Sequence, residues 1–244
     1  MLATIITEEQ WLKLKSILLD LNVYDKPSLK ETFLGIIYRL KTGCQWRYLP
    51  SCYGKANTVF KAFRRWSASG LFYRLFKRLI KDADMEWVSI DATHVRAHQS
   101  SAGSAGDDYQ YIAKSVGGNS SKIHLAVDAH GNPIEFIVSD GVTHDIKIAP
   151  MLLQLLDLQD TEFLNADKGY DSEEFRSLAY SQGVRANIPR KKNAKSNNSH
   201  MDWLIYQARH VVENTFANLK HFRALSSRYD KLLNSYISTV ALAC

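Results

Sequence analysis

The sequence predicts an α/β fold in which a mixed β-sheet flanked by helices follows an all-helical N-terminal region. Three observations favour it. Apolar residues recur at helical spacing up to about residue 84, the period then changes to that of strands, and strands next alternate with helices. With 244 residues and 45% apolar composition, the chain can form two domains with packed cores. We expect these domains at 1–84 and 85–244.

Basic residues are concentrated in the first part of the chain. Residues 1–84 contain 15 Lys and Arg against 7 Asp and Glu, whereas residues 85–244 contain 16 against 18. A basic region joined to a slightly acidic remainder indicates that one side binds a polyanion, although many soluble proteins also carry a basic surface.

The composition argues against several classes of protein. No apolar run approaches the ~20 residues that span a bilayer, and the N-terminus lacks the basic and apolar regions of a secretory signal. The three cysteines, Cys44, Cys52 and Cys244, have no metal-ligand spacing and form no even disulfide set. We therefore expect a reduced, cytoplasmic protein.

The N-terminal region contains four expected helices, each bounded by its own start or stop signal. They are one beginning with a capping box at Thr7–Gln10, one from Pro27–Glu31 to Gly43, one from Asn57 to Gly70, and one from Leu71 to about Ile80. Their spacing fits a helix-turn-helix.

The third of these helices carries a basic face. Lys61, Arg64 and Arg65 are expected opposite Phe60 and Phe63. Such a face suits a helix that lies against DNA, with guanidinium groups on phosphates or guanine edges. A solvated basic face with no ligand is an equally good interpretation of these residues alone.

The second part of the chain has the element order of an RNase H-like fold, an order that other mixed α/β folds share in part. Two polar stretches, 99–121 and 190–200, are expected as exposed loops. The expected strands are Trp87–Val95, Ile123–Val127, Ile134–Val138, Thr161–Ala166 and Ala186–Ile188, and the expected helices are Ile146–Leu156, Ser172–Ser181 and a long one containing Glu213.

Two aspartates are associated with strands, where a carboxylate is unfavourable unless it is paired, hydrogen-bonded or bound to a metal. Asp91 lies within the first strand and Asp167 follows the fourth. These strands are neighbours in an RNase H-like sheet, so the two aspartates and Glu213 could meet at one edge. Asp91 could instead bond to a turn, Asp167 could cap a helix, and Asp171 competes with Asp167 for the site.

Three carboxylates without thiol or imidazole partners suit a hard cation such as Mg²⁺ or Mn²⁺. Two such ions about 4 Å apart can activate a nucleophilic oxygen and stabilise the leaving oxygen of a phosphodiester. An acidic pocket of this kind beside a basic region is typical of an enzyme that cuts DNA.

Glu213 shares a stripe of its helix with a phenol and two cations. At about 100° per residue, Tyr206, Arg209, Glu213 and Lys220 fall within roughly 60°. Arg209 and Lys220 could hold phosphates around a metal-bound group. A structural helix could also show this stripe by chance.

These residues resemble a known pattern. Tyr206, Arg209, Glu213 and Lys220 match the Y-(2)-R-(3)-E-(6)-K signature of DDE transposases from bacterial insertion sequences, specifically families four and five. The resemblance covers nearly the whole chain. Segments similar to family five, in chain order, are "LKTGCQWRYLPSCYG", "FKAFRRWSASGLF", "SIDATHVRAHQ", "GGNSSKIHLAVDAHGNP", "GVTHD", "NADKGYDS" and "RYDKL".

The resemblance implies that Asp91, Asp167 and Glu213 are the metal-binding catalytic triad, holding two Mg²⁺ or Mn²⁺ ions. It also implies that Tyr206, Arg209 and Lys220 contact DNA, as Lys61, Arg64 and Arg65 are expected to do. The expected partners are the terminal inverted repeats of the element, target DNA and further copies of the chain, in a dimer or larger assembly near the bacterial nucleoid. Family members often continue beyond "STVALAC", which is expected to be apolar helix.

The reaction that the resemblance implies is hydrolysis at the element end, which frees a 3′-hydroxyl that then attacks target DNA by transesterification. Two other functions remain open. A repressor on the same scaffold would bind DNA without cutting it, and a junction resolvase would cut branched DNA without regard to end sequence.

Overall fold

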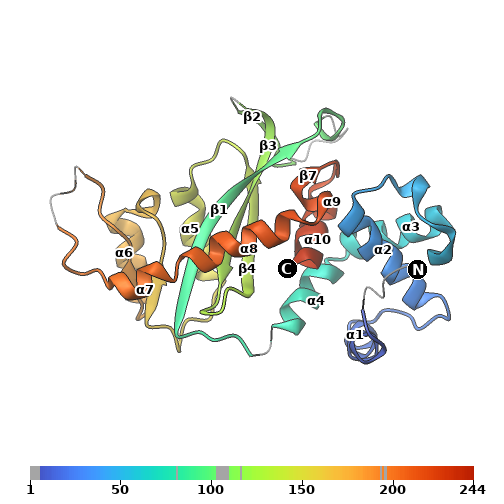
Figure 1. The fold of residues 1–244 in the computed structure, drawn as a ribbon, viewed down its shortest axis with the longest axis horizontal. Helices are drawn as coiled ribbons and strands as arrows, with labels where there is room; N and C mark the ends of the chain where they lie inside the picture. The colour runs from blue at the N-terminus through green and yellow to red at the C-terminus, as the bar shows by residue number, and fades with distance from the viewer. Residues whose placement is uncertain (1–5, 81, 103–109, 116, 193, 195–196) are drawn as a thin grey trace. The chain divides into compact units, whose positions relative to one another are not determined.

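The computed structural model describes residues 6–80, 82–102, 110–115, 117–192, 194 and 197–244 (Figure 1). The chain folds into two compact units. The first combines residues 1–81, 98–106 and 219–244, and the second combines residues 82–97 and 107–218. The sequence therefore crosses between the units several times, and the last 26 residues belong with the N-terminal helices rather than with the sheet.

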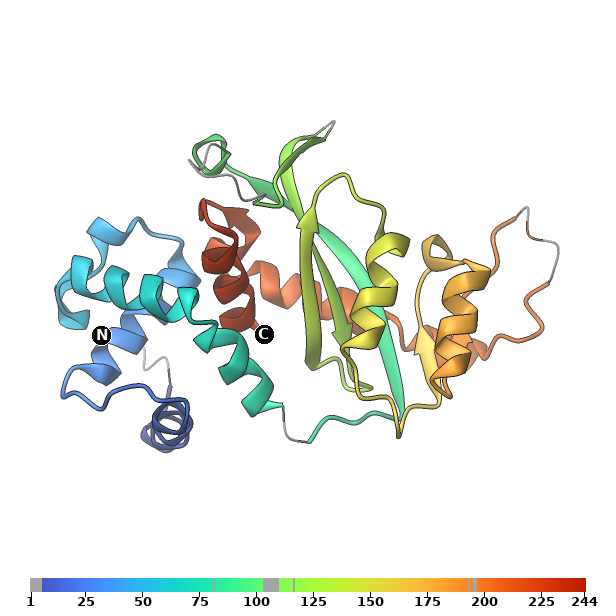
Figure 2. The ribbon, with the colours of Figure 1, turned by 180° about the vertical axis from the view of Figure 1, so that it is seen from behind.

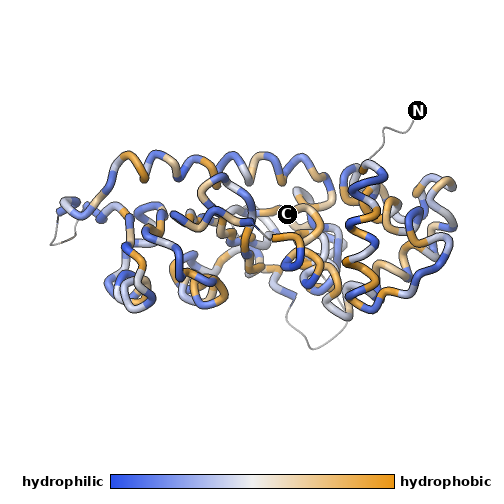
Figure 3. The backbone as a smooth tube through the Cα atoms, turned by 90° about the horizontal axis from the view of Figure 1, so that it is seen from below, coloured by the Kyte–Doolittle hydropathy of each residue, from blue (hydrophilic) through white to orange (hydrophobic). Residues whose placement is uncertain are grey.

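The first unit is helical. Its α-helices are α1 Glu8–Asp20, α2 Leu29–Thr42, α3 Ala56–Ala68, α4 Leu71–Leu79, α9 Arg223–Ser226 and α10 Leu233–Ala243, and its short 3₁₀ helices are η1 Trp46–Tyr48, η2 Ser51–Tyr53 and η3 Gln99–Ser101, with β7 Ser227–Arg228. Helix α10 packs against α2, α3 and α4. The segment that leads to the C-terminus is mostly hydrophobic, as its orange colour shows (Figure 3), because α10 is buried in this unit.

The helix signals at the N-terminus are confirmed, with one exception. The Thr7 hydroxyl accepts from the Gln10 backbone amide at 3.1 Å, and the Gln10 Oε1 atom accepts from the Thr7 backbone amide at 2.8 Å, which completes the capping box. Gly43 ends α2 with a left-handed φ of 66°. The expected cap at Asn57 is wrong, since α3 begins at Ala56 and Lys55 precedes it.

The second unit contains a mixed sheet, as the sequence predicts. Its strands are β1 Trp87–Ala97, β2 Ala113–Ser115, β3 Gly118–Val127, β4 Pro133–Asp140, β5 Phe163–Asn165 and β6 Arg185–Asn187. The strand order is β4-β3-β1-β5-β6, with β2 also beside β3. Strands β4, β3 and β1 pair antiparallel, whereas β5 and β6 run parallel to β1. This order and these directions form an RNase H-like sheet.

Helices cover both faces of this sheet. Helices α5 Asp145–Gln154 and α6 Glu173–Ser181 lie on one face, and α8 His210–Lys220 crosses the other (Figures 1 and 2). Gly131, in the hairpin between β3 and β4, has a φ of 86°, and a Cβ built there would lie 3.3 Å from Val211. The Thr215 hydroxyl donates to the Gly131 carbonyl at 2.6 Å. This close approach holds α8 against the hairpin.

The long helix expected around Glu213 is divided in two. Helix α7 spans Trp203–Gln207, and the Asp202 carboxylate caps it by accepting from two amides at 3.0 Å. The amides of Ala208 and Arg209 then bond three residues back, as in a 3₁₀ helix, before α8 begins. Because 3₁₀ spacing places residues three apart directly above one another, Arg209 lies over Tyr206.

The two stretches expected as loops are partly regular. Within 99–121, the described residues form η3, β2 and the start of β3, and residues 103–109 and 116 lie outside the described part. Within 190–200, residues 193 and 195–196 lie outside it as well, and the described residues there are neither helix nor strand. Among the described residues, no helix is long and apolar enough to cross a membrane.

Candidate active site

The parallel pairing of β1 and β5 places two aspartates at equivalent positions. The last paired residues are Ser89 on β1 and Asn165 on β5. Asp91 and Asp167 each follow two residues later, so both lie just past the point where the strands separate. Since side chains alternate across a strand, residues two apart share a face. The register thus brings the two carboxylates to one edge of the sheet.

Asp91 lies in a partly buried setting that disfavours its charge. Burial raises the pKa of Asp91 to about 6, and the negative charges of Asp167 and Glu213 add to this rise. The Ala92 amide, which donates to Asp91 at 2.8 Å, and the Arg209 guanidinium oppose it. These influences show that the three predicted acids lie close enough to act on one another.

Arg209 lies between two of the acids. Its guanidinium is 3.6 Å from the Asp91 Oδ2 atom and also donates to the Glu213 Oε1 atom. Burial lowers the pKa of Arg209, but the hydrogen bond and charge of Glu213 outweigh burial and raise it. The guanidinium also stands over the Tyr206 ring, 5.8 Å from its centroid. Arg209 therefore contacts two of the other three signature residues.

Asp167 occupies the turn that follows β5. Its carboxylate accepts from the Gly169 amide at 2.7 Å and caps the 3₁₀ helix η4, Lys168–Tyr170. Capping was one alternative to a role in the site, but one bond to an amide leaves the other carboxylate oxygen available.

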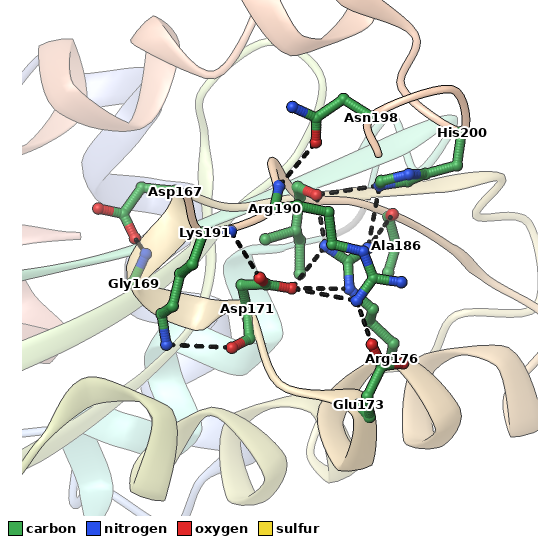
Figure 4. Close-up of polar contacts among 11 residues, drawn as sticks. Asp167, Gly169, Asp171, Glu173, Arg176, Ala186, Arg190, Lys191, Asn198 and His200 are labelled. Carbon is green, nitrogen blue, oxygen red and sulfur yellow. Dashed lines mark hydrogen bonds and ion pairs between the residues drawn. The ribbon is translucent and has the colours of Figure 1, made fainter. Parts of the chain in front are cut away.

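Asp171, the competing acid, has a structural role (Figure 4). It accepts from Arg176 at 2.8 and 3.0 Å and from the Lys191 amide at 2.8 Å. Burial tends to raise the pKa of Asp171, but the bonds from Lys191 and Arg176 prevail and lower it. Arg190 completes this cluster through Asp171 and Glu173. Because its oxygens are already used, Asp171 is not part of the candidate site.

The remaining predicted residues belong to the first unit. Lys61, Arg64 and Arg65 are exposed on α3 in the first unit, and Lys220 is exposed in the part of α8 that belongs to that unit. The expectation that Phe60 lies opposite the basic face is wrong. Phe60 is half-buried and the Arg64 guanidinium stands 5.9 Å from its ring centroid, because positions 60 and 64 are one turn apart.

Two residues near the site were missed from the sequence. Tyr170 is buried, and its pKa is raised by burial and by the nearby charges of Asp91, Asp145 and Asp167. Asp145, at the start of α5, accepts from the buried Lys122 ammonium at 2.9 Å. Both belong to quoted segments, "NADKGYDS" and "GVTHD", in which the pattern offered no reason to select them. The Nε2 atom of His94 lies 3.0 Å from the Gly141 carbonyl oxygen and forms a hydrogen bond with it.

The donor set suits a hard cation, since all three acids offer only oxygen. In the described part of the chain, however, no group of three or more His, Cys, Asp or Glu side chains is assembled to hold a metal ion. The Arg209 guanidinium lies between Asp91 and Glu213 and balances their negative charges.

Comparison with known proteins identifies the group to which these features belong. Residues 82–244 match the family described as "Transposase DDE domain", and residues 6–76 match "Putative transposase of IS4/5 family". A protein of Brucella ovis, "Putative transposase for insertion sequence element IS6501", is 32% identical over 125 residues, which cover 51% of this chain and 94% of that protein. A Burkholderia cepacia protein, "Putative transposase for insertion sequence element IS402", is 29% identical over 136 residues, covering 51% of this chain and 60% of that protein.

The fold is also that of a solved transposase. The piggyBac transposase, in a synaptic complex with hairpin DNA, superimposes with a TM-score of 0.57 and 9% identity. The match covers 91% of this chain and 65% of that one. The DDE family is metal-dependent, in keeping with the carboxylate donor set. With an RNase H-like sheet, acids at its edge and both family matches, the chain is a member of the DDE transposase family of insertion sequences.

Proposed function

We propose that Asp91, Asp167 and Glu213 bind two Mg²⁺ or Mn²⁺ ions and that this site cuts and joins DNA at the ends of an insertion sequence. The observation that carries the proposal is the Arg209 contact with both Asp91 and Glu213 beside Asp167. A cation is favoured here because the charge of Asp91 is disfavoured: burial raises its pKa to about 6, and the negative charges of Asp167 and Glu213 add to the rise.

The ions, when bound, would activate the attacking oxygen and stabilise the leaving oxygen of the phosphodiester. Arg209 is then released from its carboxylate partners and can bind a phosphate through its two-pronged guanidinium. Hydrolysis at the element end leaves a 3′-hydroxyl, and that hydroxyl attacks a phosphodiester of target DNA in the same site. No covalent bond between protein and DNA is needed.

DNA is the proposed partner of both units. Tyr206 and Arg209 would contact it beside the carboxylates, with Lys220 following on α8. Lys61, Arg64 and Arg65 would contact phosphates or base edges from α3, where all three are exposed. We further propose that two or more copies hold the two element ends together and that the protein works in the bacterial cytoplasm at the nucleoid.

A strand-cleavage assay tests the proposal. DNA from the ends of the element that encodes this chain is incubated with Mg²⁺ or Mn²⁺ and with the wild type, Glu213→Gln, or the control Glu174→Gln, which changes an exposed glutamate on α6. We expect end-specific nicking by the wild type and the control, and at least about a hundredfold less by Glu213→Gln, because several kcal/mol of transition-state stabilisation depend on the ions.

Other outcomes would point elsewhere. Equal cleavage by Glu213→Gln would remove Glu213 from the site. End binding without cleavage by any variant would favour a repressor, and cleavage of branched DNA regardless of end sequence would favour a resolvase.

A further inference from the structure

The first unit contains a cavity of about 660 Å³ that the candidate active site does not use. Its lining comes from four separate stretches of chain: the end of α2 with the loop to η1, helix α3, residues 98–100, and residues 229–235. A volume of this size is in the range of small-molecule pockets. The cavity is therefore large enough for a nucleotide.

Aromatic rings line this cavity. His98 and Tyr229 stack on one another with centroids 4.4 Å apart and planes 21° apart. Tyr229 remains 53% exposed, so part of its surface is accessible to a ligand. On the α3 side, Trp46 packs against Phe60 at 5.5 Å and Phe63 at 5.1 Å. Stacked and exposed rings of this kind suit a flat ligand.

The charged side chains of the cavity leave a positive excess. Arg39 and Asp230 neutralise one another through two hydrogen bonds of 3.1 and 3.3 Å. Arg64 and Lys231 are exposed, and neither has an ion-pair partner among the residues that the structure describes. The Arg64 guanidinium stands over the Phe60 ring, and this cation–π contact keeps its positive charge beside the aromatic lining of the cavity. A ligand with both a flat ring and a negative charge matches this lining.

A backbone bond also sets the hydrogen-bonding character of His98. The Ser100 amide donates to the Nδ1 atom of His98 at 3.1 Å, so Nδ1 is an acceptor. In the neutral ring the proton must then be on Nε2, which makes that atom a donor. His98 thus offers a ring face and an N–H group, both of which a nucleobase can use.

The "RYDKL" segment is explained by this arrangement. Arg228 is fully buried and its Nε atom donates to the Asp230 carbonyl, while the Asp230 carboxylate binds Arg39. These two residues anchor the segment inside the unit. Tyr229 and Lys231 alternate with them and face outward, because side chains of an extended segment point to opposite sides in turn. Arg228 and Asp230 thus fix the segment so that the Tyr229 ring and the Lys231 ammonium line the cavity.

We propose that this cavity binds a nucleotide, with its base stacked on Tyr229 and its phosphate held by Arg64 and Lys231. The source that we propose is an unpaired nucleotide in a DNA strand, and this part alone rests on the proposed function. A free nucleotide has the same chemistry and is distinguished by the test below.

The test measures binding by the full-length protein without divalent metal, so that no cleavage occurs. The probes are a DNA duplex with one unpaired 2-aminopurine nucleotide, the same duplex fully paired, and free 2-aminopurine deoxyribonucleoside monophosphate. The variants are Tyr229→Ala, Tyr229→Phe, and the control Tyr180→Ala, which removes a phenol that is 80% exposed on α6.

We expect the wild type to bind the unpaired duplex more tightly than the paired one and to quench its fluorescence. Tyr229→Ala should weaken this binding on the order of tenfold, the scale of losing one base–aromatic stack. Tyr229→Phe keeps the ring and should bind as the wild type does, as should Tyr180→Ala. Quenching of the free monophosphate with the same variant pattern, but no preference for the unpaired duplex, would support the cavity with a free nucleotide as its ligand.

Equal binding of both duplexes by the wild type and Tyr229→Ala, with no quenching of any probe, would overturn the cavity proposal and leave the proposed function intact. Failure to bind any probe would also overturn the cavity proposal, whereas the proposed function is decided separately by the cleavage assay on element-end DNA.

Discussion

At the scale of single residues, the site keeps the Asp91 carboxylate in a partly buried place that disfavours its charged form. Asp91 is 22% exposed as a side chain, and its pKa of about 6 is well above the ordinary value. Ser89, two residues earlier on the same strand, is fully buried, so the strand places Asp91 where the sheet begins to open. A structural acid would be expected to have a lowered pKa, as Asp171 has. The opposite pKa shifts of Asp91 and Asp171 therefore distinguish the candidate metal ligand, Asp91, from the structural acid, Asp171.

The raised pKa of Asp91 predicts a pH-dependent stability. Between about pH 4 and pH 6 the folded protein keeps a proton that the unfolded chain releases, so this residue makes the fold less stable as pH rises through that window. Metal-free Asp91→Asn should therefore be more stable than the wild type at pH 7.5, by about 1–2 kcal/mol, and equally stable near pH 3.5. Urea denaturation at both pH values measures the difference, and a variant less stable at pH 7.5 would contradict it.

At the scale of elements, a buried ion cluster fixes the turn that carries Asp167. Asp171 and Arg176 are both nearly buried, and Lys191 joins them through its amide and through its Nζ atom, which donates to the Asp171 carbonyl. The basic segment after β6 is thereby tied to the turn after β5 (Figure 4). The cluster thus connects the turn that carries Asp167 to a basic segment that supplies none of the proposed ligands.

Removing the charge of Asp171 should loosen this connection. Asp171→Asn leaves the Arg176 guanidinium buried without its partner, and we expect a loss of about 3–5 kcal/mol of stability. Trypsin should also cut faster at Arg190 and Lys191, which are freed from the turn. The matched control is Glu173→Gln, because Glu173 is 76% exposed and pairs with Arg190 only at the surface. Equal effects of the two substitutions on unfolding and on proteolysis would show that burial does not decide the role of this cluster.

At the scale of the whole molecule, the N-terminal helices depend on the end of the chain. Arg39 on α2 pairs with Asp230 while both side chains are less than a tenth exposed, and Thr239 on α10 also donates to Asp230. The side chains of Tyr236 and Val240, both on α10, are fully buried inside this unit. The unit is therefore assembled from both ends of the sequence.

We expect residues 1–84 alone to be unstable. Such a fragment keeps its four helices in sequence but loses the packing of α10 and the partner of Arg39, so its thermal unfolding followed by circular dichroism should lose cooperativity. Adding a peptide of residues 219–244 should restore a cooperative transition, whereas the same peptide with Asp230→Asn should do so poorly. A fragment 1–84 that unfolds cooperatively by itself would support the boundary expected from the sequence.

Much of this protein is determined locally and could be read from the sequence. The capping box at Thr7, the end of α2 at Gly43 and the strand around Asp91 follow from hydrogen bonds and periodicity within a few residues. The order of strands and helices then predicts the RNase H-like sheet, and the spacing of the signature residues indicates the family. These features depend on interactions between residues that are close together in the chain, so the sequence is enough to predict them.

Tertiary structure decided the rest. The β1–β5 register brings Asp91 beside Asp167, the 3₁₀ turn brings Arg209 between Asp91 and Glu213, and the fold of the first unit joins Arg39 to Asp230. The two residues of this last pair are 191 positions apart in the chain. No local pattern specifies such meetings, because they depend on how separate elements pack and on which buried charges must find a partner.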